Sequence, residues 1–416
     1  MNRLVFAAAV VFGILFACWT PPFAVPDETG HWLHSVAIAH GESWAPKPIV
    51  TVPAWSRTFI DTYAPGANIA ELSAKPRFTV AVTRDLLDVK LYNLSTYNAV
   101  GYLPSAAGVF LARGLRLSPL ATFRAGRISS TLVSALLLLV ALHVANGSRA
   151  LLTLIALTPM AAALRASYSV DALLISLAIL LAALLLSPRP RLRLALLAAL
   201  LLVIIKPPYL PLALLACFAS SSKRTRLGIA ALLTLVAIAA TLLARDVSKQ
   251  TRIRFDAHVD PSAQLHHVAQ HPREVSGVIL HDLSSKSAQY ARETIGVLGW
   301  LDIPLPRAVY WIFGVALLLA ALVRRHDVAF PQSPLLLAIA ITPFALALSV
   351  YVAWTPPGAA QLDGFQGRYL LPLLPFFALL PPIRKRDSET RAVALVLAFA
   401  SVVLGIALQA VMRHYA

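Results

Sequence analysis

The chain has 416 residues, of which 58% are hydrophobic and 13% are charged, and its mean hydropathy is +0.72. These values exclude an ordinary soluble domain and predict a single integral membrane domain over 1–416. The net charge of +17 does not indicate nucleic-acid binding, because the basic residues form short clusters between apolar runs, as in cytoplasmic loops. The clusters are Arg189, Arg191 and Arg193; Lys223, Arg224 and Arg226; Arg324 and Arg325; and Arg384, Lys385 and Arg386.

The first apolar run, residues 4–20, follows a basic start and resembles a signal peptide. Because many apolar runs follow it, we interpret it as an uncleaved anchor rather than a cleaved signal. A helix of about 20 apolar residues crosses about 30 Å of hydrocarbon, so the later runs are candidate spans. These runs are 99–112, 126–145, 149–165, 169–187, 192–206, 208–220, 227–244, 307–323, 333–353, 368–382 and 391–411.

The basic clusters predict the topology. If the N-terminus and all four clusters are cytoplasmic, 22–98 and 246–306 are external loops. Residues 98 and 168 are then both external, so one of the three runs between them does not cross the membrane. We expect this to be 99–112, a short run containing Gly101 and Pro104, as a re-entrant or interfacial helix. A topology in which 99–112 spans stays open.

The predicted fold class is therefore an all-α polytopic membrane protein with about eleven (ten to twelve) transmembrane helices. Its long first external loop contains juxtamembrane helices. The stretch DETGHWLHSVAIAHGE in that loop places Trp32, Val36 and Ala39 on one helical face, which predicts an amphipathic helix resting on the membrane. Trp32, Trp44 and Trp55 allow two interpretations, stacking on sugar rings or anchoring at the membrane interface.

Polar residues from six separate segments lie at one outer level in this topology. Charges beside a span cost a few kcal/mol, so each one needs a reason. The candidate site residues are Asp27, Glu28, Arg165, Asp171, Lys206, Trp300, Asp302, Gln366, Arg368 and Tyr369. Snorkelling side chains, an Arg165–Asp171 pair across a turn and N-terminal helix capping by Glu28 are the structural alternatives. Bases on the outer face, where few are expected, favour an anionic ligand.

The mixture of acids and bases predicts a type of chemistry. Arg presents a planar fork to phosphate and Lys a point charge, while a carboxylate can deprotonate a hydroxyl. Together they favour the transfer of a sugar from a polyprenyl phosphate, whose chain lies among the spans, to an acceptor hydroxyl. His31 and His34 lie beside the acids, so a divalent metal held with Asp27 stays open beside a structural role for the two histidines. No other cofactor is expected.

Five stretches carry a resemblance to a known family: PPFAVPDETGHWLHSVAIAHGE, TPMAAALRASYSVDALLISLAILL, KPPYLPLALL, GVLGWLDIPLPRAVYW and GFQGRYLLPLLP. In order and spacing, from residue 20 to about 382, they resemble a bacterial family of predicted multi-span membrane proteins, domain of unknown function 2142. That family is similar in layout to the GT-C superfamily, whose members are membrane glycosyltransferases that use polyprenyl-phosphate sugars.

The resemblance implies an inverting glycosyltransferase with Asp27 as catalytic base and Glu28 as a supporting acid. Arg368 and Lys206 would hold the donor phosphate, and the remaining candidates would contact substrate. The chain departs from better-known GT-C members in having no sizeable soluble domain after the last helix. We therefore expect a lipid-linked or cell-surface glycan, or a glycolipid, as acceptor. The resemblance also implies a bacterial inner membrane, with the active face periplasmic.

Two other functions fit the same residues. A transporter or flippase for a lipid-linked glycan would also gather charges among helices, although such proteins place key charges near the bilayer midplane. A non-catalytic assembly protein of the cell envelope would not need its external acids to converge. The distances among Asp27, Asp171 and Arg368 discriminate between these functions and the enzyme.

Overall fold

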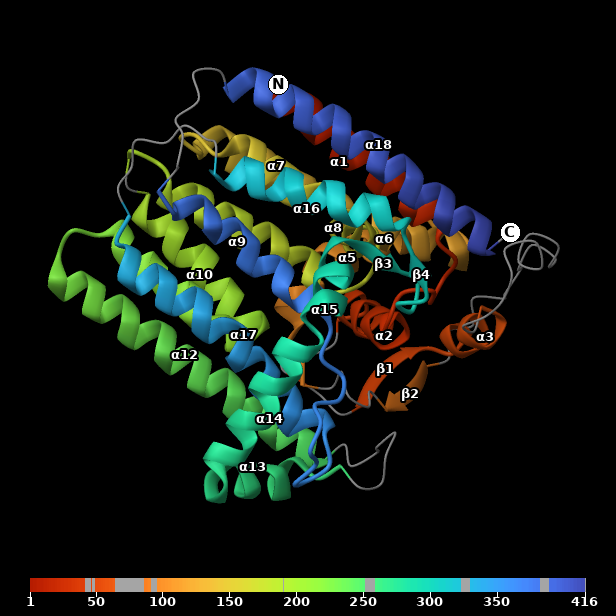
Figure 1. Cartoon of the computed structure of the whole chain (residues 1–416). Coiled ribbons are helices and arrows are strands. Elements are labelled where there is room, and N and C mark those ends of the chain that lie inside the picture. The colour runs from red at the N-terminus through yellow and green to blue at the C-terminus, as the bar shows by residue number, and fades with distance from the viewer. Residues whose placement is uncertain are drawn as a thin grey trace.

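Tilted helices, packed into a bundle, form the body of the molecule in the computed structural model (Figure 1). The structure describes residues 1–41, 46, 49–63, 86–90, 96–189, 191–250, 259–322, 330–381 and 389–415. Trp44, the basic clusters at 324–325 and 384–386, and parts of both predicted external loops lie outside the described residues.

The described elements of the first half of the chain are mainly helices. They are α1 (Asn2–Trp19), α2 (Glu28–Ala39), β1 (Ile49–Pro53), α3 (Trp55–Thr62), β2 (Leu86–Lys90), η1 (Ala99–Tyr102), α5 (Leu103–Gly114), α6 (Pro119–Val144), α7 (Arg149–Ala156), α8 (Pro159–Arg165), α9 (Asp171–Leu185) and α10 (Leu192–Ile205). Here and below, η denotes a 3₁₀-helix. Strands β1 and β2 pair antiparallel, with Thr51 opposite Asp88.

Helices also dominate the second half. They are η2 (Pro207–Tyr209), α11 (Leu210–Ala213), η3 (Leu214–Ala219), α12 (Lys223–Gln250), α13 (Pro261–Gln270), α14 (Pro272–Ser285), α15 (Ser287–Gly296), α16 (Arg307–Leu322), α17 (Gln332–Trp354), η4 (Gly367–Leu379) and α18 (Glu389–Tyr415). A short antiparallel hairpin, β3 (Val297–Leu298) with β4 (Ile303–Pro304), follows α15.

Helix forms in every predicted apolar run, which confirms a mostly helical membrane protein. Of the described helices, α1, α6, α12, α17 and α18 are long and apolar enough to cross a membrane. Helices α9, α10 and α16 have 15, 14 and 16 residues. At 1.5 Å per residue they are about 21–24 Å long, less than the roughly 30 Å of hydrocarbon. The count of about eleven crossings stays a prediction.

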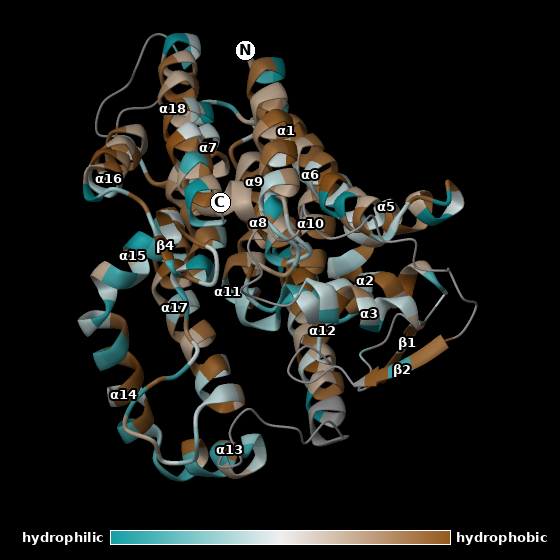
Figure 2. Cartoon of the chain, turned by 90° about the vertical axis from the view of Figure 1, so that its right-hand side faces the viewer, coloured by the Kyte–Doolittle hydropathy of each residue, from teal (hydrophilic) through white to brown (hydrophobic). Residues whose placement is uncertain are grey.

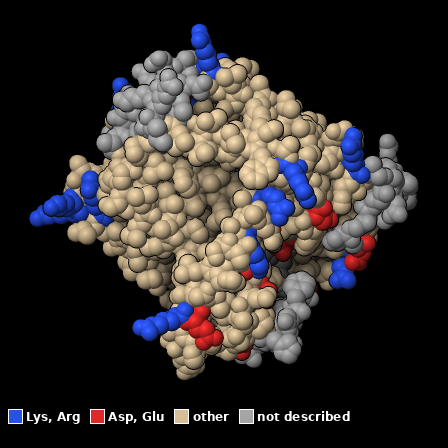
Figure 3. Space-filling view, viewed as in Figure 1, with Lys and Arg blue, Asp and Glu red and all other residues tan. Residues whose placement is uncertain are grey.

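The surface polarity follows the long helices. Hydrophobic residues run along them, while polar residues are frequent on α13, α14 and α15 (Figure 2). Among the described residues, a broad face of the bundle shows no Lys, Arg, Asp or Glu, and the charged side chains at the left-hand edge of that view are Lys or Arg (Figure 3). Such an apolar belt with charges at its edges is what a lipid-facing surface requires.

Residues 99–112 form η1 and the start of α5. With 12 residues, α5 is about 18 Å long, too short to span. It packs closely on α6, because a Cβ atom at Gly108 would lie 2.3 Å from the Ala125 carbonyl oxygen. Helix α5 lies at an angle to α1 and α18 and runs toward the side of the molecule (Figure 2). An interfacial role for this segment stays a prediction.

The predicted run 149–165 is divided into two short helices. Helix α7 ends at Ala156, and α8 begins at Pro159, where the Thr158 hydroxyl accepts a hydrogen bond from the Ala161 amide at 3.1 Å. A capping Thr followed by Pro at the first helical position is a start signal for a new helix. After the break, α8 is a separate short helix, and its Met160 and Leu164 line one cavity with Pro26 of the loop that follows α1.

Helix α2 forms where expected, but it is not one-sided. Nine of its 12 residues are buried, on both faces. Trp32 is fully buried, and its ring centroid lies 5.5 Å from that of Phe23 and 5.3 Å from that of Phe59. The prediction of a one-sided α2 is therefore wrong, and so are both interpretations of Trp32, because protein covers its side chain. A position of α2 at the membrane surface stays a prediction. Trp55 packs beside Trp32 at 6.0 Å.

Candidate functional site

Four charged side chains from distant segments meet in one cluster, which we name the charged cluster: Asp27, Asp171, Lys206 and Arg368. An Arg368 Nη2 group donates to Asp27 Oδ2 at 3.1 Å, and Arg368 Nε lies 3.8 Å from Asp171 Oδ2. Lys206 Nζ donates to Asp171 Oδ1 at 2.8 Å. The predicted convergence of these four segments is thus observed. Two acids face two bases, so the cluster is neutral overall.

Asp27 occupies the start of α2 in an unusual backbone conformation. Its φ of +63° lies in the left-handed region, which non-glycine residues enter at a free-energy cost, Asp and Asn least. Such strain persists only where the surroundings enforce it, and it is concentrated at functional sites. The Asp27 side chain is also 34% exposed, against 3–5% for Arg368 and Asp171. Asp27 is therefore the accessible acid of the cluster.

Helix ends position Asp171 and Lys206. Asp171 opens α9, where a carboxylate suits the helix dipole, and Lys206 follows the last residue of α10. The Lys206 ammonium lies 4.4 Å from the Tyr369 ring centroid and 6.0 Å from that of Tyr97. Burial raises the pKa of Tyr97 to about 12. Tyr97 therefore stays neutral, and both aromatic rings face the Lys206 cation, a stabilising arrangement.

Helix α15 holds the backbone that carries Arg368. Glu293 Oε2 accepts from the Gly367 amide at 2.6 Å, and the Thr294 hydroxyl donates to the Gly367 carbonyl at 2.8 Å. The approach is close, since a Cβ atom at Gly367 would lie 2.1 Å from the Tyr290 carbonyl oxygen. Within the part of the chain that the structure describes, Arg368 Nη1 and Nε have no hydrogen-bond partner, although the side chain is buried. Arg368 therefore keeps donor capacity for an anionic ligand.

His31 borders the charged cluster. Burial, and then the charge of Arg368, lower the pKa of His31 to about 3. Its Nδ1 lies 2.8 Å from the Tyr102 hydroxyl oxygen, and the His34 ring stacks on Tyr102 at 4.7 Å. The histidines therefore take part in a buried aromatic group. Within the described residues, no group of three or more His, Cys, Asp or Glu side chains could hold a metal ion.

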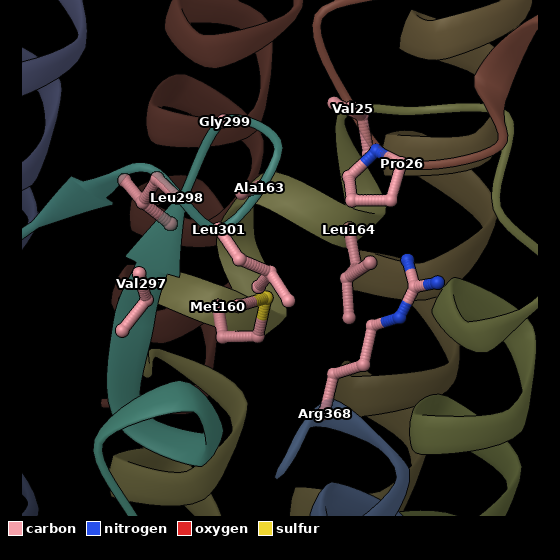
Figure 4. Close-up of a pocket in the computed structure, with 10 residues that line it drawn as sticks. All are labelled: Val25, Pro26, Met160, Ala163, Leu164, Val297, Leu298, Gly299, Leu301 and Arg368. Carbon is pink, nitrogen blue, oxygen red and sulfur yellow. The ribbon is translucent and has the colours of Figure 1, made fainter. Parts of the chain in front are cut away.

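A small cavity of about 20 Å³ opens beside Arg368. Among the described residues that line it, Arg368 is the one that carries a charge, and its guanidinium points past Leu164 toward Pro26 (Figure 4). The other lining residues are Val25, Met160, Ala163, Val297, Leu298, Gly299 and Leu301. The cavity joins the loop before α2, α8 and the β3–β4 hairpin, so apolar space directly adjoins the cationic end of the cluster.

Glu28, the neighbour of Asp27, faces a different partner. Its carboxylate is fully buried and pairs with Arg127 of α6, with Arg127 Nε to Oε1 at 2.9 Å and Nη2 to Oε2 at 2.5 Å. Sequence analysis missed Arg127, which lies inside an apolar run. A lone arginine in a predicted span is the signal that would have identified it. The alternative interpretation, in which Glu28 caps the N-terminus of its own helix, does not account for its contacts with Arg127.

The described contacts of the remaining predicted site residues are with residues outside the charged cluster. Arg165 donates to the Ala156 carbonyl at the end of α7 and forms no described ion pair with Asp171. Trp300 Nε1 donates to the Phe23 carbonyl at 3.0 Å. Asp302 Oδ2 lies 3.4 Å from His414 Nε2. Gln366 precedes η4, with its Oε1 buried and without a hydrogen-bond partner. Their roles toward substrate stay predictions.

The sequence model of the family described as "Predicted membrane protein (DUF2142)" matches residues 10–377. No curated protein and no solved structure matches the chain.

Proposed function

The chain belongs to the family of predicted membrane proteins with domain of unknown function 2142, and from that premise we propose that it is a membrane glycosyltransferase. It moves a sugar from a polyprenyl-phosphate donor to a lipid-linked or cell-surface glycan acceptor. The observation that carries the proposal is the charged cluster, in which the partly exposed Asp27 carboxylate pairs with Arg368, and the buried Asp171 links Arg368 to Lys206, beside apolar space.

Asp27 is the general base in this proposal. Its carboxylate accepts the proton of the acceptor hydroxyl as the hydroxyl oxygen attacks the anomeric carbon of the donor. The bond from that carbon to the phosphate oxygen breaks on the opposite side, so the configuration inverts and polyprenyl phosphate leaves. Arg368 and Lys206 stabilise the negative charge that develops on the leaving phosphate.

Before the donor binds, the ion pairs within the charged cluster balance its charges. In the free protein, Asp27 and Asp171 neutralise Arg368 and Lys206, so each of the four charges of the cluster has a counter-charge. A phosphate group approaching the free Nη1 of Arg368 competes with Asp27 for the guanidinium. Asp27 is then released as a base when donor is bound. The exposure of its side chain fits this exchange.

The orientation follows the charges. We place the N-terminus in the cytoplasm and the charged cluster at the outer face. The described basic cluster near 190 lies between α9 and α10, at the ends opposite Asp171 and Lys206, and the cluster near 224 is separated from Lys206 by η2, α11 and η3. The donor lipid then lies in the outer leaflet of a bacterial inner membrane, with its chain along the apolar belt.

One observation favours a second function, a transporter or flippase for a lipid-linked glycan. Broken helices mark many transport sites, and the apolar run 149–165 is divided between α7 and α8. A transporter needs no base, so removing the Asp27 carboxylate while keeping its shape separates the two functions.

The test is the Asp27→Asn variant, expressed in cells that lack the native chain. Asn tolerates left-handed backbone and still accepts a hydrogen bond from Arg368, so the fold is retained. We expect normal membrane insertion and a loss of glycan transfer of at least about a hundredfold, the usual scale for general-base loss. Asp61→Asn, the same change at an exposed site on α3, is the control. Near-normal glycan output from Asp27→Asn contradicts the proposal.

A further inference from the structure

We propose that Arg127 and Glu28 are positioning residues that hold Asp27 at the charged cluster. The inference rests on the proposed function, in which Asp27 is the base. It gives Glu28 a role different from that of a supporting acid, and it assigns a role to Arg127, which lies in α6, 99 residues along the chain from Glu28.

All five N–H groups of Arg127 are used. Besides the two bonds to Glu28, Nη1 donates to the carbonyls of Ala17 at 3.2 Å and Thr20 at 2.6 Å, and Nη2 donates to the carbonyl of Pro21 at 2.9 Å. These carbonyls lie at the end of α1 and just beyond it, where a helix leaves acceptors unsatisfied. Arg127 therefore fixes the point at which the chain leaves the bundle.

Glu28 fixes the other end of the same loop. Its Oε2 accepts from the Phe23 amide at 3.0 Å, and its Oε1 accepts from the Tyr168 amide at 3.3 Å. With the two bonds from Arg127, each oxygen accepts two hydrogen bonds. Glu28 is fully buried, so it has neither a route to substrate nor a free lone pair on its described contacts for proton transfer.

The loop between these two fixed points is strained. Phe23 and Asp27 both have positive φ, +64° and +63°. Neither conformation is favoured for a residue with a side chain, so the surrounding contacts must enforce it. The Arg127–Glu28 pair supplies such contacts on both sides of residues 21–28. A consequence is that Asp27 points to Arg368 while its neighbour Glu28 points to α6.

The experiment compares two properties of variants, donor-lipid binding and sugar transfer. The Glu28→Gln/Arg127→Gln double variant removes both charges together, so no unpaired charge is buried. A long-chain polyprenyl phosphate is titrated onto each purified protein in lipid nanodiscs. Transfer is measured with membranes of each variant and a lipid extract from cells that lack the chain. Arg127→Lys, which keeps the charge but loses the fork, is the second variant.

We expect the double variant to bind polyprenyl phosphate within about twofold of the native protein, because Arg368 and Lys206 are intact. Transfer should fall about a hundredfold, the scale of a base displaced by about 1 Å. Arg127→Lys should show the same separation of binding from transfer, so the test holds even where the double variant does not fold. A merely structural role would instead lower both properties together.

Three outcomes overturn the inference. These are native transfer rates in either folded variant, a parallel loss of donor binding and transfer, or a failure of both variants to fold, which would show that the pair acts on the whole fold. Asp27→Asn in the same assay keeps the proposals apart. If Asp27→Asn transfers normally, the proposed function fails; if Asp27→Asn is inactive while the double variant is fully active, only the positioning role fails.

Discussion

At the scale of single residues, the candidate site is a balance of buried charges. Asp171 and Arg368 are 5% and 3% exposed, so each depends on its counter-charge to avoid a large desolvation cost. Lys206 completes the set, and Asp27 is its most exposed member. Substitutions in the cluster must therefore be chosen to separate the loss of a ligand contact from the loss of a charge partner.

Arg368→Ala should weaken donor binding. We expect affinity for a long-chain polyprenyl phosphate to fall about tenfold to a hundredfold, because hydrogen bonds to charged groups contribute about 1.5–3 kcal/mol. Titration in nanodiscs measures the change. Arg368→Lys, which keeps a cation beside Asp171, should lose less. Arg57→Ala, at an exposed arginine of α3, is the control. Unchanged affinity in Arg368→Ala would remove the phosphate role.

His31 should make the protein sensitive to acid. Its pKa is about 3 in the folded state and about 6.5 when unfolded. Below pH 6.5 the unfolded chain takes up a proton that the folded chain does not, so the free energy of unfolding falls as the pH is lowered toward 3. Between pH 7 and pH 5, the free energy of unfolding of the native protein should fall by about 1–2 kcal/mol through His31. The His31→Gln variant should not show this part of the decrease.

Thermal unfolding in detergent at both pH values checks this expectation. The exposed His281, changed to Gln, is the control. If His31→Gln loses as much stability on acidification as the native protein, the burial of a neutral imidazole does not explain the acid response.

At the scale of elements, the site depends on how closely secondary structures approach one another. Helix α15 touches η4 through the bonds of Glu293 and Thr294 to Gly367, and the β3–β4 turn reaches the loop before α2 through Trp300. The segment from α15 to β4 therefore contacts both the Arg368 side and the Asp27 side of the charged cluster. Its packing should affect activity without any direct contact with substrate.

Gly367→Ala should disturb this packing. The added methyl would lie 2.1 Å from the Tyr290 carbonyl oxygen, a backbone atom that cannot move alone. We expect a loss of about 1–3 kcal/mol in the free energy of unfolding, as in other overpacked sites, together with weaker donor binding. Gly405→Ala in α18 should be neutral or stabilise the helix by up to about 1 kcal/mol, because an added Cβ there would have no described neighbour within 4 Å beyond its own helix backbone. Equal stability of both variants would contradict the close α15–η4 contact.

At the scale of the whole molecule, the apolar runs and four of the charges could be predicted, because both signals are local. Asp27, Asp171, Lys206 and Arg368 each stand beside an apolar run, where a charge is expensive and easily noticed. The break between α7 and α8 had a local signal too, in Thr158 followed by Pro159.

The rest depended on contacts between distant parts of the chain. The role of Arg127 follows from its contact with Glu28, and that of Glu293 from its contact with the backbone of Gly367. The residues next to Arg127 and Glu293 in the sequence do not reveal these contacts. The burial of Trp32 among Phe23, Phe59 and Phe123 likewise requires the loop to fold back on α6. Helical periodicity places a residue on a face, but it does not show what covers that face.

The central claim is that the charged cluster transfers a sugar from a polyprenyl phosphate. Mass analysis of lipid-linked glycans tests it most directly, in cells that lack the chain and in the same cells carrying the native protein or Asp27→Asn. We expect one polyprenyl-phosphate sugar to accumulate without the protein, to disappear with the native chain and to persist with Asp27→Asn. The same lipid-linked glycans at the same levels in all three strains would contradict it.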